Sequence, residues 1–209
     1  MSRQDLWERF REKAEATSTS VTEASDTREA LQYVLHLCRK KEACQSLASG
    51  CDLPLSGAAA DLCSLKEPEK VLAAPDLKEE ELDILRPMCT EHNIALLSGG
   101  LRARLGGIDV GLTWAESAIA ATGTLVQNCP GEDTRLAGMI SEVHALLIPA
   151  SNIVEQSREL AEALQQRMAR GIDSTAFITG PSRTADIERV LTLGVHGPLE
   201  VHAVLLQDR

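Results

Sequence analysis

Hydrophobic and polar positions along the chain follow two different periods. Short apolar runs bounded by Gly, Pro or polar residues predict buried strands, whereas apolar positions three and four residues apart predict helices. Strands are predicted at residues 71–74, 94–98, 108–113, 125–128, 144–149, 176–179 and 201–206. The strand, helix and strand between residues 71 and 98 have the order of a βαβ unit. The pattern therefore favours an α/β fold with a parallel-rich central sheet flanked by helices.

Helices are predicted where apolar positions recur at helical spacing. They cover residues 4–16, 27–41, 77–89, 153–170 and 184–193, and a short Ala-rich helix carrying Glu116 is expected before Gly123. Asp26 with Glu29, and Asp76 with Glu79, have the spacing of capping boxes at two of the N-termini. Pro87 is expected to kink or end the helix at 77–89, because proline has no backbone N–H to donate.

A Thr/Ser run at residues 17–20 follows the first predicted helix. Short polar side chains compete with the helical backbone for hydrogen bonds, which is typical of a linker. Residues 1–25 are therefore expected to form an arm outside the core. We divide the chain into a helical N-terminal region at residues 1–50 and an α/β domain at residues 51–209.

Composition excludes several classes of protein. The chain has 209 residues, 44% of them hydrophobic, which is enough for one core with an appendage. A formal net charge of −10 and an aromatic content of 2% argue against nucleic acid as a partner. No apolar run reaches the roughly 20 residues of a membrane helix. The charged start, MSRQDLWERF, is unlike a secretion signal, so a cytoplasmic location without a membrane span is expected.

The cysteines and the known short motifs limit the chemistry. Neighbouring cysteines are separated by at least five residues, without the CxxC spacing of structural zinc or iron–sulfur sites. We therefore expect no metal and no cofactor, and mostly buried thiols. The chain also lacks HExxH, GxSxG, P-loop and GxGxxG patterns. Their absence removes the zinc protease, serine hydrolase, P-loop NTPase and ordinary Rossmann dehydrogenase classes.

The segment ITGPSRTADIERVLTLGVHGP, residues 178–198, is the strongest candidate for a ligand site. An apolar strand there runs into Gly180, Pro181, Ser182, Arg183 and Thr184. At an expected strand-to-helix turn, backbone N–H groups and the positive helix end favour a phosphate or carboxylate. Arg183 can add a bidentate contact, and Asp186 can hold Arg183 or stabilise the helix. The alternative is that Ser182 or Thr184 only caps the helix.

The loop that ends this segment carries His196, followed by Gly197. A histidine between glycines in a loop can be a general acid/base, an anion ligand or an exposed residue without a role. Because two Gly-Pro loops occur within twenty residues, we expect them to form two walls of one crevice at strand ends.

A second segment, IDVGLTWAESAIAATGTLV at residues 108–126, places hydroxyl groups and a carboxylate at another strand end. Its candidate ligand-binding residues are Thr113, Gly123 and Thr124. Glu116 can act as an acid/base or a nucleophile. The alternative is a carboxylate that only interacts with the dipole of a helix N-terminus.

Both segments resemble the LUD-domain family. The resemblance is carried by DVGLTWAESAIAATGTLV, by residues 135–148 leading into LLIPASNIV, and above all by ITGPSRTADIERVLTLGVHGP. It covers residues 68–206; Trp114 departs from the pattern, where we expect a small residue. The resemblance implies a fold similar to the glucosamine-phosphate deaminase, ribose-phosphate isomerase and coenzyme A transferase superfamily. It also implies a role in bacterial oxidation of L-lactate to pyruvate, alongside two iron–sulfur partner proteins.

The leading hypothesis is a cluster-free accessory or regulatory subunit of a lactate-oxidising complex. It would bind a small anionic metabolite near residues 180–184 and His196. The alternative is a stand-alone enzyme of the isomerase or acyl-transferase kind, acting on a sugar phosphate or a coenzyme A thioester with Glu116 and His196 as catalytic residues. A third hypothesis is an interaction module with an acidic surface. The sequence is compatible with a homo-oligomer.

Overall fold

The structure, a computed structural model, describes residues 2–41, 70–104, 107–169, 174–184, 192–193 and 197–207. Its α-helices are α1 (Arg3–Ala16), α2 (Thr27–Lys40), α4 (Glu79–Glu91), α5 (Glu132–Ile140) and α6 (Ala161–Met168). Its strands are β1 (Thr19–Ala24), β2 (Lys70–Ala73), β3 (Ile94–Leu97), β4 (Ile108–Trp114), β5 (Ser117–Ile119), β6 (Thr124–Cys129), β7 (Ser141–Pro149), β8 (Ile153–Val154), β9 (Ser174–Ile178), β10 (Arg183–Thr184), β11 (Thr192–Leu193) and β12 (Glu200–Leu206).

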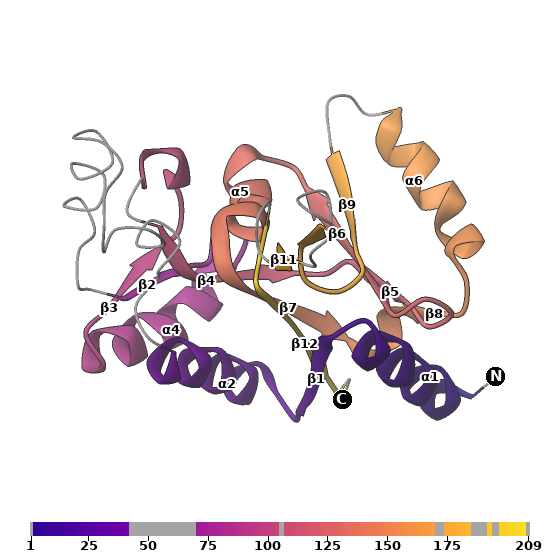
Figure 1. The fold of residues 1–209 in the computed structure, drawn as a ribbon, viewed down its shortest axis with the longest axis horizontal. Helices are drawn as coiled ribbons and strands as arrows, with labels where there is room; N and C mark the ends of the chain where they lie inside the picture. Colours follow the sequence, from indigo (N-terminus) through magenta and orange to yellow (C-terminus); the bar gives the residue numbers. More distant parts are fainter. Residues whose placement is uncertain are drawn as a thin grey trace.

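Within these residues the main sheet has six strands in the order β1-β12-β7-β4-β2-β3 (Figure 1). Every pairing in it is parallel. β2 and β3 pair from Lys70 opposite Ile94 to Ala73 opposite Leu97, with α4 between them in the chain. The predicted βαβ unit and the predicted α/β fold with a parallel-rich sheet are confirmed.

Both faces of the main sheet are covered. On one face α2 and α4 pack on the apolar residues of β2, β4, β7 and β12. On the other face lie α1, α5 and a smaller sheet of the order β8-β5-β6-β9. Figure 1 shows α2 beside α4, and α1 beside β8. Leu147 and Ile148 of β7, neighbours in sequence, lie in two different cores. Burial on both faces explains why this strand reads as one continuous apolar run.

The N-terminal residues belong to this architecture, so the prediction of an arm outside the core is wrong. β1 includes part of the expected linker and pairs with β12 from Thr19 opposite Val201 to Ala24 opposite Leu206. Phe10 of α1 is fully buried beside residues of β7 and β12. β12, the partner of β1, lies near the other end of the chain. The local sequence of β1 carries no sign of this pairing. The proposed boundary at residue 50 lies outside the described residues.

Three predicted helices are wrong in part. The Ala-rich stretch after Glu116 is the strand β5, which pairs antiparallel with β6. Ile153 and Val154, the predicted start of a long helix, form β8, and α6 begins at Ala161. Thr184 and Leu193, the ends of the last predicted helix, lie in the antiparallel pair β10 and β11; residues 185–191 are outside the described part of the chain. Hydrogen bonding to a neighbouring strand overrides local helix propensity in each described case.

The two predicted helix starts have different outcomes. Asp26 caps α2 by accepting from the backbone N–H of Glu29, as expected. α4 begins instead at Glu79 after Lys78, whose backbone N–H donates to the Glu81 carboxylate at 2.8 Å. The helix also continues through Pro87 to its end at Glu91, so the proline does not terminate it.

β7 carries a histidine inside the core. His144 is 1% exposed, and its Nε2 lies 2.8 Å from the Thr113 hydroxyl on β4. A Cβ on Gly138 of α5 would lie 2.8 Å from the ring, so the helix packs directly on it. Nδ1 has no hydrogen-bond partner within the described part of the chain. Burial lowers the pKa of His144 to about 3, which keeps the imidazole neutral.

We expect Phe10→Ala to lower the free energy of unfolding by about 3–5 kcal/mol, because truncating a fully buried ring leaves a cavity. Urea denaturation measures the change. Glu12→Ala on the same helix is the control, since that side chain is 72% exposed; its effect should stay below about 0.5 kcal/mol. Equal effects of the two substitutions would mean that α1 is not part of the core.

Stability should also depend on pH through His144. The unfolded chain takes up a proton below the ordinary pKa of 6.5, whereas the folded ring does not until about pH 3. The free energy of unfolding therefore falls as the pH drops from 6.5, by about 2 kcal/mol between pH 7 and pH 5. His144→Gln should remove this part of the loss in urea titrations at the two pH values. The exposed His36 offers a control, His36→Gln. An unchanged loss in His144→Gln would contradict the assignment.

Candidate functional site

The two segments singled out in the sequence meet through their hydroxyl groups. β6 pairs with β9, and Leu125 lies opposite Ile178. Beside this pair the Thr124 hydroxyl lies 2.8 Å from the Thr179 hydroxyl, and 2.7 Å from that of Thr122. A chain of three hydroxyl groups thus joins residues that are more than fifty positions apart.

The two Gly-Pro loops are also in contact where they are described. The backbone N–H of Ser182 donates to the carbonyl oxygen of Pro198 at 2.9 Å. A Cβ on Gly197 would lie 3.2 Å from the Ser182 side chain. Pro181 is buried, and Thr184 lies in β10. We call this group the motif cluster: Thr124, Thr179, Gly180, Ser182, Arg183 and Gly197. Two predicted residues, Asp186 and His196, lie outside the described residues.

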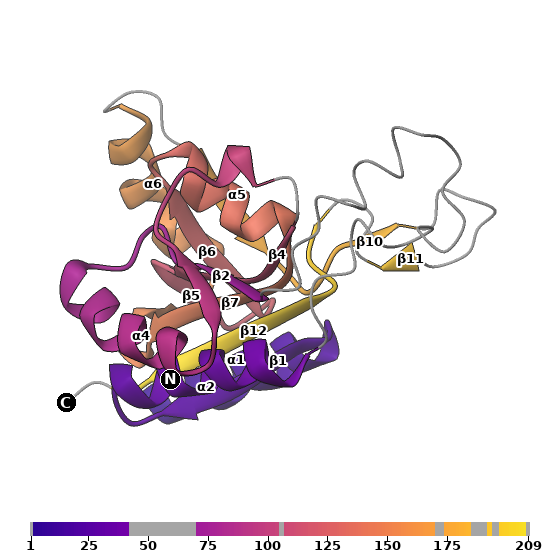
Figure 2. The same ribbon diagram turned by 90° about the vertical axis from the view of Figure 1, so that its left-hand side faces the viewer.

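The motif cluster lies at the amino-terminal edge of the main sheet. Pro198 precedes β12, which starts at Glu200. Figure 2 shows β10 and β11 beyond the start of β12, on the side of the molecule away from the C-terminus. Ligands of open α/β sheets usually bind at the opposite, carboxyl edge. The general rule for ligand sites therefore does not predict the contact between the two loops.

The C-terminal end of α1 explains two of the motif glycines. Gly123 has φ of +66°, and a Cβ there would lie 2.3 Å from the backbone nitrogen of Ala14. Gly180 has φ of +80°, and its Cβ would lie 2.2 Å from the carbonyl oxygen of Thr17. Only glycine combines this backbone conformation with such a close approach. These positions were selected as ligand-binding candidates, and the structure gives each of them a packing role.

Arg183 also contacts α1. Its Nη2 donates to the carbonyl oxygen of Thr17, the C-cap residue of the helix. A cation is favourable there because the helix C-terminus carries a partial negative charge. The guanidinium has five N–H donors, and the bond to Thr17 uses one of them. Together with the hydroxyls of the motif cluster, an exposed guanidinium held in this way can bind an oxyanion.

Two other predicted site residues have partners elsewhere. Glu116, at the start of the β5 hairpin, forms an ion pair with Arg167 of α6. Arg167 also donates to the Thr175 hydroxyl of β9 at 3.2 Å. Thr113 is fully buried and bonded to His144. Neither contact involves the motif cluster, so the structure does not bring Thr113 or Glu116 together with it.

A further polar group lies at the carboxyl edge, between β2 and β4. β2 leads through α4 on one face to β3, whereas β4 leads through α5 on the other face to β7. This is a topological switch point, where α/β sheets commonly bind ligands. Asp76 follows β2 and accepts from the backbone N–H of Trp114 at 3.0 Å. The Trp114 indole N–H donates to Glu81 at 3.3 Å.

Asp76 is therefore not the helix cap that its spacing with Glu79 suggests. Its Oδ1 is buried without a hydrogen-bond partner among the described residues. Burial raises the pKa of the Asp76 carboxyl to about 6, against the opposing effect of the Trp114 N–H. A carboxyl group with this pKa can exchange protons near neutral pH. The signal in the sequence is an aspartate separated from the apolar run 71–74 by one proline, and its spacing with Glu79 predicts a helix cap instead.

The described residues contain no group of three or more His, Cys, Asp or Glu side chains placed to hold a metal ion. None of the helices in this part of the chain combines the length and apolarity needed to cross a membrane. Cys38, Cys89 and Cys129 are buried, and burial raises the pKa of Cys38 to about 12.

Comparison with known proteins identifies relatives of this chain. "Lactate utilization protein C" from Bacillus subtilis (strain 168) is 33% identical over 104 residues, which cover 48% of this chain and 43% of the relative. The protein of the same name from Exiguobacterium sp. is 37% identical over 103 residues, covering 48% and 45%. Each match thus spans less than half of the relative.

A solved structure has the same fold. The crystal structure of a DUF162 family protein from Deinococcus radiodurans, at 1.70 Å resolution, superposes with a TM-score of 0.61 and covers 99% of both chains at 16% identity. The sequence model of the LUD domain matches residues 7–206, a range that begins within α1 and includes β1. Because this match extends over most of the chain, the protein belongs to the LUD domain family.

Proposed function

We propose that this protein takes part in the utilisation of L-lactate, as a cluster-free accessory or regulatory subunit that acts with iron–sulfur partner proteins. The observation that carries the proposal is the similarity to relatives named lactate utilization protein C. Membership of the LUD domain family supports it. The cysteine spacing, which lacks CxxC, supports a subunit that does not itself hold an iron–sulfur cluster.

The ligand in this proposal is a small anion, bound at the motif cluster. Lactate and pyruvate each carry a carboxylate, and a phosphorylated metabolite carries a phosphate. All three present oxygen acceptors that suit a guanidinium and hydroxyl donors. Support comes from the hydroxyl chain of Thr124 and Thr179, 2.8 Å apart, and from the anchored Arg183 in the same cluster. His196 is proposed as an additional ligand or acid/base from the adjoining loop.

The anion site can be tested with Arg183→Ala in thermal-shift titrations against lactate, pyruvate and phosphate. A ligand at about 100 times its dissociation constant adds about 2.7 kcal/mol of apparent stability. We expect the unmodified protein to gain stability with at least one of these anions, and Arg183→Ala to lose that gain. The melting temperature without ligand separately reports the lost bond to Thr17.

Arg102→Ala is the matched control for this titration. Arg102 is an exposed arginine that pairs with Glu132 and has no contact with the motif cluster. It removes the same charge, so a general electrostatic effect would appear in both variants. A full ligand gain in Arg183→Ala, or no gain with any anion in the unmodified protein, would contradict the proposed site.

The role in lactate utilisation can be tested independently of the ligand. In the source organism, deletion of the gene should abolish growth on L-lactate as the carbon source while growth on pyruvate continues. The affinity-tagged full chain should restore growth and co-purify with iron–sulfur proteins. Normal growth of the deletion strain on lactate, with no such co-purification, would exclude the role. Turnover of a sugar phosphate or coenzyme A thioester by the purified chain alone would instead favour the enzyme alternative.

A further inference from the structure

A pocket of about 230 Å³ lies at the carboxyl edge of the main sheet, under the first turns of α1. We call it the α1 pocket. Its lining residues come from α1, from the ends of β1 and β12, and from the turn after β7: Arg3, Gln4, Trp7, Glu23, Ala150, Leu205, Leu206 and Gln207. It is separate from the motif cluster, which lies at the other end of α1 and at the amino edge of the sheet.

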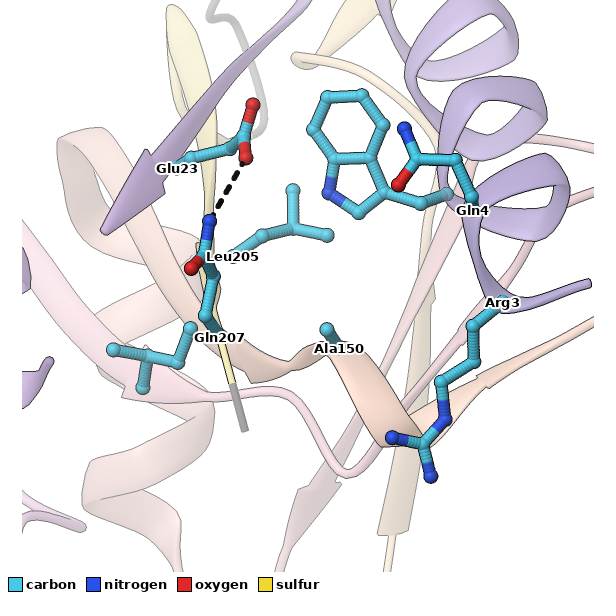
Figure 3. A pocket seen from close by; sticks show the side chains of 8 residues that line it. Arg3, Gln4, Glu23, Ala150, Leu205 and Gln207 are labelled. Atoms are coloured by element: carbon cyan, nitrogen blue, oxygen red, sulfur yellow. Dashed lines mark hydrogen bonds between the residues drawn. The ribbon is translucent and has the colours of Figure 1, made fainter. Parts of the chain in front are cut away.

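Both apolar and polar side chains line the α1 pocket, and we call its exposed residues Arg3, Gln4, Glu23 and Gln207 the mouth. Trp7 and Leu205 line the pocket, and Figure 3 shows the methyl group of Ala150 directed toward it. Leu205 is 1% exposed and belongs to the core that α1 covers. The amides of Gln4 and Gln207 belong to exposed residues and lie around the pocket in Figure 3. Binding sites for small organic molecules commonly combine these two features.

The polar groups of the mouth are held in place. The backbone N–H of Gln207 donates to the carbonyl oxygen of Ala24, so the pairing of β1 with β12 extends beyond Leu206. The Gln207 side-chain amide donates to the Glu23 carboxylate at 3.4 Å. The Gln4 amide donates to Glu8 at 2.9 Å, which leaves its carbonyl oxygen toward the pocket (Figure 3). The mouth therefore offers hydrogen-bond acceptors as well as amide N–H donors.

The charges of the lining favour an uncharged ligand. Arg3 is the cation of the mouth, and it already has a partner of its own. The Glu23 carboxylate, 45% exposed, lies 3.9 Å from the Arg11 guanidinium, so an uncharged ligand leaves the charged groups of the lining with the partners they have. The Arg11 guanidinium lies 4.8 Å from the centre of the Trp7 ring and covers part of the indole. A second cation would compete with Arg11 for the same ring.

Volume limits the size of the ligand. A cavity of roughly 150 Å³ holds benzene, a ring of six carbon atoms. In proportion, the α1 pocket accommodates about nine non-hydrogen atoms. A purine base has this size, and a larger molecule that contains one, such as a nucleoside, would leave its remaining part outside the pocket. A nucleobase is also planar, which suits the indole wall, and carries donors and acceptors side by side on its edge, which suits amide side chains.

We propose that the α1 pocket binds a nucleobase, as the free base or as an uncharged nucleoside, with its ring against Trp7 and its polar edge toward Gln4 and Gln207. The ribose of a nucleoside would remain at the mouth. This site is additional to the anion site of the proposed function, and neither depends on the other for its support.

Fluorescence of Trp7 measures the binding. The chain has two tryptophans, so Trp114→Phe leaves Trp7 as the single reporter. Adenine and adenosine should quench its emission with saturation. Benzoate, an aromatic ring without the base's donors, and lactate should not. Saturable quenching by benzoate equal to that by adenine would overturn the nucleobase assignment, and so would the absence of quenching by adenine and adenosine.

Two substitutions test the location. Ala150→Leu fills the interior and should weaken adenine binding at least about tenfold, whereas the matched Ala150→Ser should bind as the parent does. Gln207→Ala removes only an exposed amide, leaves the backbone pairing intact and should weaken binding by up to about tenfold. Circular dichroism confirms that each variant is folded. Unchanged affinity in both Ala150→Leu and Gln207→Ala would overturn the proposal. The lactate titration of Arg183 variants has its own readout, so the two proposals can fail separately.

Discussion

The parallel pairing of β1 with β12 joins the start of the chain to its end, and the rest of the molecule depends on this contact. It fixes the direction of α1, because the helix leads directly into β1. The C-terminal end of α1 then meets Gly123, Gly180 and Arg183. Its first turns cover the ends of the same two strands and form the α1 pocket. One strand pairing therefore positions both candidate ligand sites.

The sequence predicts the interior of the main sheet well and its periphery poorly. β4 and β7 are buried on both faces. Such strands appear in the sequence as short, mostly apolar runs, which differ from the spacing of apolar positions in a helix. β1 is an edge strand with exposed positions, TSVTEA, and its partner is distant in sequence. β5 is short and begins an Ala-rich stretch, whose local preference is helical. Hydrogen bonding to β6 and β8 decides its conformation, and sequence spacing does not reveal these neighbours.

The candidate site, like the fold, could be predicted from the sequence only in part. Ser182 and Arg183, predicted from a Gly-Pro loop after a strand, belong to the motif cluster, in which Ser182 lies beside Gly197 and Arg183 beside Gly180. The packing roles of Gly123 and Gly180 could not be predicted from the sequence. They depend on contacts with the end of α1, a helix that the sequence places outside the core. Asp76 was also missed. Its significance comes from crossovers on opposite faces of the sheet, a property of topology that no local motif contains.

The position of Arg183 is central to the anion site that we propose at the motif cluster. The C-terminus of a helix carries about half a negative charge and repels anions. An anion beside Thr17 is therefore unfavourable unless a cation stands between it and the helix. The guanidinium can do this with separate donors, because one N–H holds the carbonyl of Thr17 and the group has four further N–H donors. A lysine has a compact ammonium group without the planar fork, and cannot divide its donors between two acceptors with the same geometry. Arginine at this position thus holds the end of α1 and, in the proposed anion site, would also balance the charge of the ligand.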